Sequence, residues 1–473
     1  MTTTADASPA AGASAASAAR SDYDAALARL RAELVALPAD APVRLAKRTS
    51  NLFRPRTELA GRGLDVSGFD AVLSVDPEAR TADVGGMTTY EHLVDATLPY
   101  GLMPAVVPQL KTITLGGAVS GLGIESSSYR NGLPHESVLE MDVLTGSGEV
   151  LLAQPDGEHA DLWAGLPNSY GTLGYAVRLR IALQPVQPVV RLERVLFSDP
   201  EAFFAAMEQV SADSSWQGQH IDFVDGVAFA PDELVLCLGS FTSATPEGVP
   251  LSDYTGSQVF YRSLPGGGVD YLSVRDYLWR WDTDWFWCSA TFGVQNPKIR
   301  RWLPKGWLRS DNYARIVRLE GRYGVKRRID RARGLPDREN VIQDVEVPIG
   351  RAAQFLAAFD EQIAIRPVWT CPLRVQRAEG WPLYPMEAGQ TYVNFGFWAS
   401  VALDPGDTDG AYNRRVEDLV ATHHGHKSLY STAFYDQDTF WRLYNGPAYR
   451  RLKQRYDPQG RLLDLYDKCV RRS

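Results

Sequence analysis

The hydrophobic pattern near the amino terminus predicts a helix. It begins after Ser21 or Asp22, which can cap it, and Pro38 stops it. Its apolar face consists of four leucines at helical spacing, Leu27, Leu30, Leu34 and Leu37. Residues 1–20 are dominated by Ala, Ser and Thr, a composition typical of a disordered tail.

Alternating apolar and polar positions then predict two β-hairpins. Strands at 71–75 and 81–84 flank a turn at 76–78, and strands at 138–144 and 149–152 flank a Gly/Ser turn. Between the hairpins, Thr88 and Glu91 form a capping box that predicts a helix ending near Gly101.

A further strand is expected at 175–183, and Pro185 and Pro188 after it mark a domain boundary. From about 190 onward strands and helices alternate, with strands at 234–238 and 391–398 and a helix at 351–363. The expected fold class is therefore α+β in two domains, 21–186 and 187–424, with a segment 425–473 that packs back near the first domain.

The composition is that of an ordinary globular protein, with 45% hydrophobic and 22% charged residues. A net charge of −8 argues against nucleic acid as the partner. The four cysteines are far apart, which suggests neither a disulfide framework nor a zinc site. The start of the chain does not have the form of a secretory signal, and no apolar run reaches the length of a transmembrane helix, so a cytoplasmic protein is expected.

The segment 112–132 is the most unusual part of the sequence because it holds five glycines and several serines. Glycine lets the backbone approach a ligand closely, and exposed N–H groups in such loops bind pyrophosphate. The segment has neither the Rossmann pattern nor the G-K-[ST] of a Walker loop. Composition alone leaves two interpretations open, a set of turns or a dinucleotide-binding loop.

The order of the motifs resembles the FAD-binding domain of the vanillyl-alcohol-oxidase (PCMH-type) family. The segments that carry the likeness are Arg48-Thr49-Ser50-Asn51, Leu64-Asp65-Val66-Ser67, residues 75–81, Thr114-Leu115-Gly116-Gly117 and Gly171-Thr172-Leu173-Gly174. Within that family the chain is most similar to the Δ24-sterol reductase (DIMINUTO-like) group. The segments that carry this likeness are residues 123–128, Asp161-Leu162-Trp163, Gln343-Asp344, residues 367–372, Leu429-Tyr430 and residues 466–468.

The resemblance implies a PCMH-type fold with an α+β substrate or cap domain and a non-covalently bound FAD. The residues that it assigns to the cofactor are Arg48, Thr49, Ser50, Asn51, Thr114, Gly116, Gly117, Gly121, Gly123, Ile124, Ser127, Ser128, Gly132, Gly171, Thr172, Gly174 and Val177. The first phosphate loop departs from the family because it lacks the usual glycines, so Lys47, Arg48 and Arg54 are expected to hold phosphate by charge. His135 is expected to be structural and not a flavin attachment point. The membrane-spanning N-terminus of the animal and plant reductases is not expected here.

The second domain is rich in tryptophan and in positive charge. Six of the twelve tryptophans lie at 279–307, which suits a packed core, an apolar pocket or a lipid interface. Residues 298–333 carry 13 Lys or Arg against 3 Asp or Glu, densest at Lys326-Arg327-Arg328. A solvated face is the simplest interpretation, and the alternatives are an anionic membrane surface at the inner face of the membrane, an acyl-carrier partner or the phosphates of NADPH.

The expected function is reduction of an isolated C=C bond in a lipid, with NADPH as the reductant of the flavin. The substrate is a sterol side chain or a methylene-branched fatty acyl chain, since the Ala- and Arg-rich composition suits a bacterial relative of the latter kind. Such an alkene needs a proton donor in a dry pocket, and chemistry and motif position nominate Glu125, Tyr430 and His426. The alternatives are an alcohol or sugar oxidase or dehydrogenase, and a non-catalytic flavin- or lipid-binding protein. The three histidines at 423, 424 and 426 have no further ligand nearby, so no metal site is expected.

Overall fold

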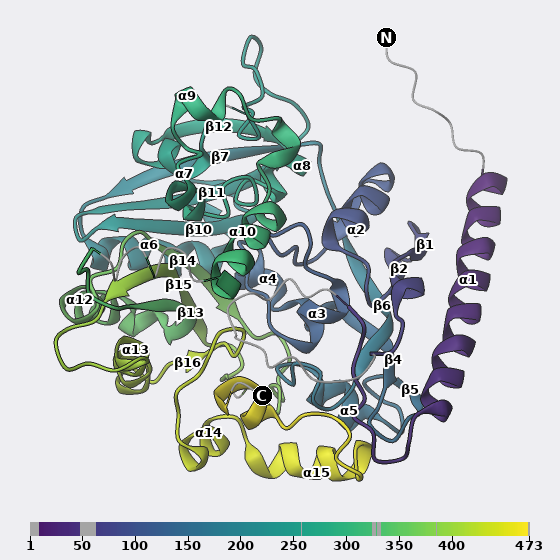
Figure 1. Ribbon diagram of the computed structural model, residues 1–473. Helices are drawn as coiled ribbons and strands as arrows, with labels where there is room; N and C mark the ends of the chain where they lie inside the picture. Colours follow the sequence, from purple (N-terminus) through teal and green to yellow (C-terminus); the bar gives the residue numbers. More distant parts are fainter. Residues whose placement is uncertain are drawn as a thin grey trace.

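The computed structural model describes residues 9–47, 63–256, 258–323, 328, 333–384 and 386–471 (Figure 1). Its named strands form a six-stranded sheet, an eight-stranded sheet and one short ribbon, all paired antiparallel, with helices around them. The α+β fold expected from the sequence is confirmed.

The six-stranded sheet belongs to the first domain and has the order β1-β2-β6-β4-β5, with β3 paired to β6. Its strands are β1 Val72–Asp76, β2 Thr81–Gly85, β3 Leu102–Pro104, β4 Val138–Leu144, β5 Val150–Ala153 and β6 Tyr175–Pro185. The helices around it are α1 Pro9–Ala36, α2 Tyr90–Thr97, α3 Leu115–Ser120, α4 Ser128–Asn131 and α5 Ala160–Gly165. The predicted hairpins are confirmed to within one residue, and the helix between them is capped by Thr89, one residue after the expected Thr88.

The eight-stranded sheet has the order β12-β7-β11-β10-β14-β15-β13-β16. Its strands are β7 Val189–Phe197, β10 Phe223–Ala230, β11 Glu233–Thr242, β12 Gly268–Ser273, β13 Arg338–Pro348, β14 Val368–Arg374, β15 Thr391–Ala402 and β16 His426–Lys427. The short ribbon joins β8 Ser215–Trp216 and β9 Gln219–His220. The first sheet ends at Pro185 and the second begins at Val189, on either side of the expected boundary at residue 186.

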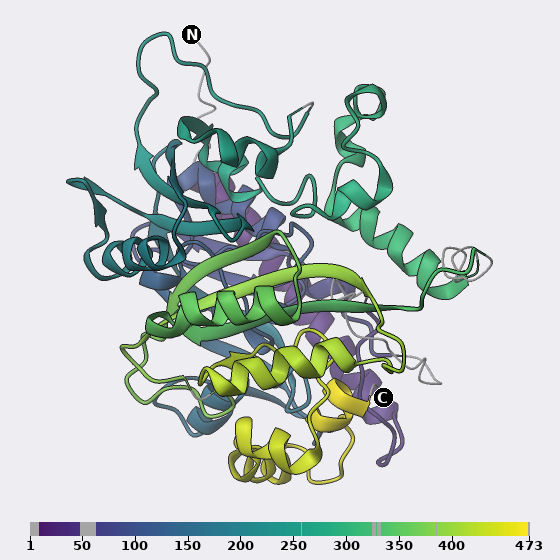
Figure 2. The same cartoon turned by 90° about the vertical axis from the view of Figure 1, so that its left-hand side faces the viewer.

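The helices of this part of the chain are α6 Pro200–Asp213, α7 Phe260–Ser263, α8 Val274–Leu278, α9 Pro297–Arg300, α10 Ser310–Tyr323, α12 Ala352–Gln362 and α13 Ala411–Thr422. Helices α6, α12 and α13 cover one face of the eight-stranded sheet (Figure 2). The side chains between them form an apolar core that includes Phe203, Phe355, Val345 and Phe395. Because successive residues of a strand point to opposite faces, the other face of this sheet receives the alternate residues of each strand.

That other face packs against the first domain. Val227, Trp369 and Cys371 share one apolar cluster with Leu93 and Leu179 of the first domain. The backbone N–H of Val224 on β10 donates to the carbonyl of Ser126 at 2.7 Å, which joins the Gly/Ser-rich segment to the sheet. A site between the two domains therefore has this face of the sheet as one wall.

The last part of the chain carries α14 Gln437–Leu443 and α15 Gly446–Tyr456, and it contacts both domains. Strand β16 pairs with β13, whereas Lys453 donates to the carbonyl of Thr172 at 2.9 Å and Lys468 to that of Tyr170 at 2.5 Å. Figure 1 shows α15 beneath the first domain, below α5, and α14 beside α15 below β16. Two lysines of this segment thus bind the carbonyls of the Gly171–Gly174 loop region.

The amino-terminal helix begins earlier than the sequence predicted. Residues 9–20, placed in a disordered tail by their composition, are part of helix α1. The segment is rich in alanine, which has the highest intrinsic helix propensity, and it continues a helix that Tyr23, Leu30 and Leu34 anchor on the first domain. Composition indicated that these residues bury little, but it did not indicate that the anchored helix extends through them.

Among the described residues, no helix combines the length and the apolar character that crossing a bilayer requires.

Candidate active site

The two Gly-rich segments expected to hold the cofactor lie against each other. The N–H of Asn168 donates to the carbonyl of Gly121 at 3.1 Å, and the N–H of Tyr170 to that of Ser120 at 2.8 Å. The packing around Gly121 is close, because a Cβ on it would lie 3.0 Å from the carbonyl oxygen of Gly117 and 3.3 Å from the Tyr170 ring. The loops at 114–123 and 168–174 are therefore one structural unit, as a shared ligand requires.

Thr114 organises the first of these loops. Its hydroxyl caps helix α3, accepting from the N–H of Gly117 at 3.3 Å, and it also accepts from the ammonium of Lys47 at 3.0 Å. Gly117 itself is exposed, so its backbone is accessible to a ligand. A lysine beside accessible backbone N–H groups is suited to a phosphate.

Polar atoms of the second loop are buried without a hydrogen-bond partner in the described part of the chain. They are the Oδ1 atom of Asn168 and the hydroxyl of Ser169. Burying an unpaired polar group costs free energy, so such atoms indicate a polar ligand between the loops. The isoalloxazine and ribityl groups of FAD offer donors and acceptors of this kind, and the site fits the cofactor.

Other residues assigned to the cofactor are already engaged by the protein. The hydroxyl of Ser127 donates to the carbonyl of Ala105, that of Ser128 accepts from the N–H of Glu125, and that of Thr172 donates to the carbonyl of Ser169. Gly132 and Gly174 have positive φ angles and pack tightly against neighbouring groups. These hydrogen bonds and close contacts hold the backbone of the loops in place.

The remaining residues that the resemblance assigns to FAD lie in different parts of the first domain. Val177 is fully buried in the core beside α1, and its carbonyl accepts from the N–H of Gly86. Gly123 and Ile124 are half-buried and lead into Glu125, and Gly116 and Gly171 are buried within the loops. Arg48, Thr49, Ser50 and Asn51 of the first phosphate loop, and Arg54, lie outside the described residues.

His135 is buried and faces aromatic rings. Its ring lies 4.3 Å from that of Trp381 in an edge-on arrangement, and burial lowers its pKa to about 3. It is therefore neutral at physiological pH.

The face of the eight-stranded sheet that meets the first domain carries a row of polar side chains. The strand register places Asp225 of β10, Cys371 of β14, Asn394 of β15 and Glu346 of β13 in line on this face, and all four are buried. Asp344 lies two residues from Glu346 on β13, opposite Gly396, and it is half-buried. Polar groups are unusual in a core that is otherwise apolar, so this row marks the wall as a candidate for chemistry.

Glu125 lies at the β10 end of this row. Its carboxylate accepts from the N–H of Gln109 at 2.8 Å, and burial raises its pKa well above the ordinary value despite that bond and the charge of Arg280. Arg280 pairs with Asp225 at 2.7 Å nearby.

Tyr430 and His426 lie at the β13 end. Tyr430 and Asp344 are close enough to affect each other's pKa, and burial raises the pKa of Tyr430 well above the ordinary value. Burial lowers the pKa of His426 to about 4, so its imidazole is neutral.

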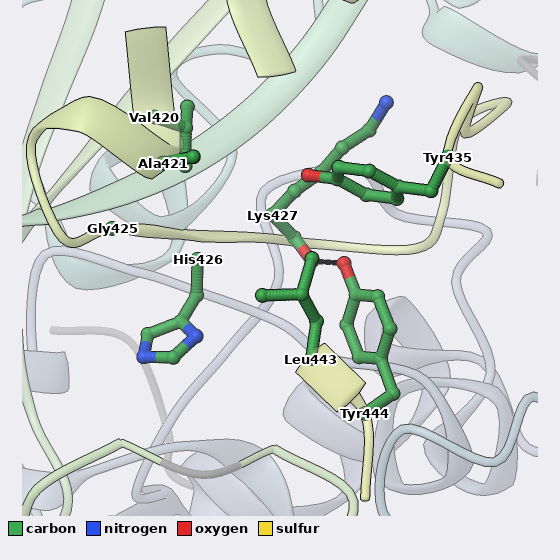
Figure 3. A pocket seen from close by; sticks show the side chains of 8 residues that line it. All are labelled: Val420, Ala421, Gly425, His426, Lys427, Tyr435, Leu443 and Tyr444. Atoms are coloured by element: carbon green, nitrogen blue, oxygen red, sulfur yellow. Dashed lines mark hydrogen bonds between the residues drawn. The ribbon is translucent and has the colours of Figure 1, made fainter. Parts of the chain in front are cut away.

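His426 also lines a small pocket at the edge of the sheet with Val420, Ala421, Gly425, Lys427, Tyr435, Leu443 and Tyr444 (Figure 3). The ammonium of Lys427 turns into the protein and donates to Glu417 at 2.6 Å and to the carbonyl of Thr432 at 2.8 Å. Tyr444 donates to the carbonyl of Lys427. The polar groups of this pocket are thus used to hold the carboxy-terminal segment.

The three nominated proton donors do not form one cluster. Three strand spacings separate β10 from β13, which is roughly 14 Å. Glu125 at one end and Tyr430 at the other therefore cannot both contact the same substrate carbon. The structure adds Asp344 and Glu346, which the sequence patterns did not nominate as acids of the site. Their signal was two acids at alternate positions of a strand, separated and followed by Val345 and Val347.

The tryptophans of 279–307 divide into two sets. Trp279, Trp281, Trp285 and Trp287 are buried, which confirms a packed core for this set. Phe286 from the same segment stacks on Trp398 at 4.3 Å between ring centroids, and it contacts Trp369 at 5.6 Å. Trp302 and Trp307, by contrast, are 76% and 66% exposed.

Clusters of His, Cys, Asp and Glu suited to a metal ion do not occur among the described residues.

Comparison with known proteins identifies the cofactor domain. Residues 32–153 match the family model of an FAD binding domain. The chain is 27% identical over 439 residues to the Delta(24)-sterol reductase of Arabidopsis thaliana, covering 86% of this chain and 76% of that protein. It is 25% identical over 408 residues to the Delta(24)-sterol reductase of Homo sapiens, covering 85% of this chain and 76% of that protein. Cytokinin dehydrogenase 5 of Arabidopsis thaliana is 33% identical over 162 residues, which is 34% of this chain and 29% of that protein. The resemblance inferred from the motifs, to a PCMH-type FAD-binding domain and to the Δ24-sterol reductases, is confirmed.

Proposed function

Because the chain is an FAD-dependent oxidoreductase, we propose that it reduces an isolated C=C bond in a lipid and that NADPH is its reductant. The observation that carries the proposal is how much of the chain resembles each of two kinds of flavoenzyme. The likeness to sterol reductases runs through both domains, whereas the likeness to the cytokinin dehydrogenase covers about a third of the chain. The second domain, which forms the other wall of the site, thus supports a reductase.

The residues that would hold FAD non-covalently are those of the paired loops. Lys47, Thr114 and the backbone of Gly117 suit its phosphates, and Asn168 and Ser169 suit its polar ring edges. When bound, FAD supplies the hydride of the reduction. His135, whose ring packs edge-on against Trp381, is given a structural role in this proposal and not one in flavin attachment.

The substrate proposed is a methylene-branched fatty acyl chain or a sterol side chain. Both present an alkene that is not conjugated to a carbonyl, and both need an apolar environment. The rings of Phe286, Trp369 and Trp398 line the sheet face beside the polar row and offer such an environment. The Ala- and Arg-rich composition favours the fatty acyl substrate.

Anaerobic mixing of the flavin-loaded protein with NADPH tests the electron donor. We expect the flavin absorbance to bleach within seconds, and the reduced protein to be reoxidised by a methylene fatty acyl lipid or a Δ24-sterol. The same experiment with NADH is the control for the nucleotide. Bleaching by alcohols or sugars instead, with no response to NADPH, would contradict the reductase and favour an oxidase or dehydrogenase. Absence of turnover with every donor would point to a non-catalytic flavin- or lipid-binding protein.

We also propose that the chain contacts an anionic membrane surface through the segment at α9 and α10. Trp302 and Trp307 are exposed here with Ile299, beside the exposed basic residues Lys298 and Arg301. Figure 2 shows helix α10 extending away from the eight-stranded sheet, so this segment can reach a flat surface. Indole rings next to basic side chains are typical of interfacial anchoring. Lys326 and Arg327, in the densest part of the charge run, lie outside the described residues.

Vesicle flotation tests this contact. We expect the wild-type protein to bind vesicles that contain anionic lipid and to be released by salt. The double variant Trp302→Ala/Trp307→Ala is expected to bind about 10-fold more weakly, since apolar burial at the interface is lost. Leu152→Ala, which removes an exposed side chain on β5, is the matched control and should bind normally. Equal flotation of the double variant and the wild type would contradict the proposal.

A further inference from the structure

Asp344 occupies a central position on the wall of the site. It lies on β13, between β15 and β16, and its neighbours Val345 and Val347 on the same strand are buried in the helix-covered core. Alternation along the strand directs Asp344 to the opposite face, toward the first domain. Burying a carboxyl group in such a place costs stability unless hydrogen bonds compensate for the lost water.

The surroundings of the Asp344 carboxyl are aromatic on one side and polar on the other. A Cβ added to Gly396 would lie 2.5 Å from Asp344 Oδ1, 2.9 Å from the Trp398 ring and 3.2 Å from the Trp369 ring. The carboxyl and the two indole rings therefore converge over this glycine. On the polar side, Asn394 donates to Oδ1 at 3.4 Å, and Tyr430 is near enough to lower the pKa of Asp344.

The groups that face Asp344 allow it to hold a proton near neutral pH. The titratable neighbours on the adjoining elements are Glu346, Cys371 and Tyr430, with Tyr170 beyond Tyr430, and none of them is a cation. His426 on β16 is neutral as well. Burial raises the pKa of Asp344 to about 7, although the hydrogen bonds from Asn394 and Tyr430 lower it. The acid form thus predominates below pH 7 and the carboxylate above it.

Asp344 is linked to the loops that fit the flavin through Tyr430 and Tyr170. Tyr170 is near enough to Tyr430 to affect its pKa, and the Tyr170 ring lies against Gly121 in the paired loops. Glu346, by comparison, is held by the hydroxyls of Tyr384 and Ser428. Glu125 is bound by the N–H of Gln109 at the opposite end of the row. Asp344 differs from these two acids because its carboxyl lies beside the Trp369 and Trp398 rings and is linked through Tyr430 and Tyr170 to the cofactor loops.

We propose that Asp344 is the proton donor of the reduction and that Tyr430 is its positioning residue, an inference that rests on the proposed function. The alkene gains a proton from the Asp344 carboxyl at one carbon and a hydride from reduced FAD at the other. Two C–H bonds would form, while the C=C π bond, the O–H bond of Asp344 and the bond that carries the hydride in the reduced flavin would break, which would leave the flavin oxidised. Asp344 would regain a proton from water, and hydride from NADPH would return the flavin to its reduced form.

Single-turnover reduction of a lipid alkene by the NADPH-reduced protein tests the proposal. We expect Asp344→Asn to slow alkene reduction by about 100-fold or more, a typical contribution of a general acid. Reduction of the flavin by NADPH should stay within about 2-fold of wild type, because hydride transfer to the flavin does not use the Asp344 proton. Asp232→Asn, in the exposed turn between β10 and β11, is the matched control.

The pH dependence distinguishes a proton donor from a structural residue. The wild-type rate should fall as pH rises above about 7, because the acid form is the active one. Tyr430→Phe removes a hydrogen bond that lowers the pKa of Asp344, so the fall should move to higher pH. An infrared difference spectrum between wild type and Asp344→Asn should show a carboxylic acid band that disappears over the same pH range, with or without flavin.

The possible results distinguish an error in the Asp344 assignment from an error in the proposed function. If the wild type reduces lipid alkenes and Asp344→Asn does so at a similar rate, the donor assignment is overturned. If Glu125→Gln is the variant that loses activity with an altered pH profile, Glu125 takes the role. If the wild type reduces no lipid alkene although NADPH bleaches its flavin, the proposed function itself fails, and the donor role with it.

Discussion

Replacing Gly86 by alanine is expected to destabilise the first domain severely and to abolish flavin binding. A Cβ at Gly86 would lie 1.9 Å from the carbonyl oxygen of Ala176, which is backbone of the central strand β6 and cannot turn aside. The carbonyl of Gly86 also accepts from the N–H of Gly116 at 2.9 Å, and this bond sets helix α3 against the sheet. The free energy of unfolding should fall by about 3 kcal/mol or more.

Urea denaturation and the ratio of bound flavin to protein measure this effect. The matched control is Gly350→Ala, because Gly350 is exposed, has no atom near the added Cβ and does not have a positive φ. Its stability should change by less than about 1 kcal/mol. A Gly86→Ala protein with near-normal stability and full flavin content would show that the strand and the helix can separate without cost.

Replacing Arg280 by methionine is expected to have the second largest effect on stability. Arg280 and Asp225 form an ion pair whose two side chains are each 1% exposed. The Asp225 carboxylate also accepts from the indole N–H groups of Trp281 at 3.3 Å and Trp369 at 3.2 Å. Removing the cation leaves a buried, uncompensated carboxylate, which costs about 3–5 kcal/mol.

Two further variants isolate the pairwise interaction. The control is Arg275→Met on helix α8, which breaks a bond to Asp95 in which both side chains are more than 40% exposed, and it should cost at most about 1 kcal/mol. The double variant Arg280→Met/Asp225→Asn should be more stable than Arg280→Met alone, because it removes the unpaired charge. Equal losses from Arg280→Met and Arg275→Met would contradict the argument.

The elements of the first domain were predictable because their signals are local. Turn residues and alternation located β1, β2, β4 and β5 to within one residue. The order of the Gly-rich motifs was also enough to indicate the cofactor, since the loops at 114–117 and 171–174 depend on short segments of backbone. Strands β11 and β15 extend further than their patterns suggested, because one neighbouring strand continues the ladder in each case: β7 pairs with β11 through Thr242, and β13 pairs with β15 through Ala402.

The composition of a segment did not predict its structure or burial where these depend on contacts with neighbouring segments. The tail at 9–20 is helical because it continues an anchored helix. The tryptophans of 279–307 are buried or exposed according to whether they face the eight-stranded sheet or the projecting segment at α9 and α10.

The sequence by itself determined the fold class, the cofactor and the kind of chemistry, because these follow from local turns, glycines and the order of motifs. Only the tertiary structure decided which polar side chains share the face of the eight-stranded sheet that meets the first domain. Asp225, Asp344 and Asn394 come from distant parts of the chain, and the order β10-β14-β15-β13 brings them to one face. That order depends on long-range strand pairing and on which face each strand buries, and neither is encoded in any single segment.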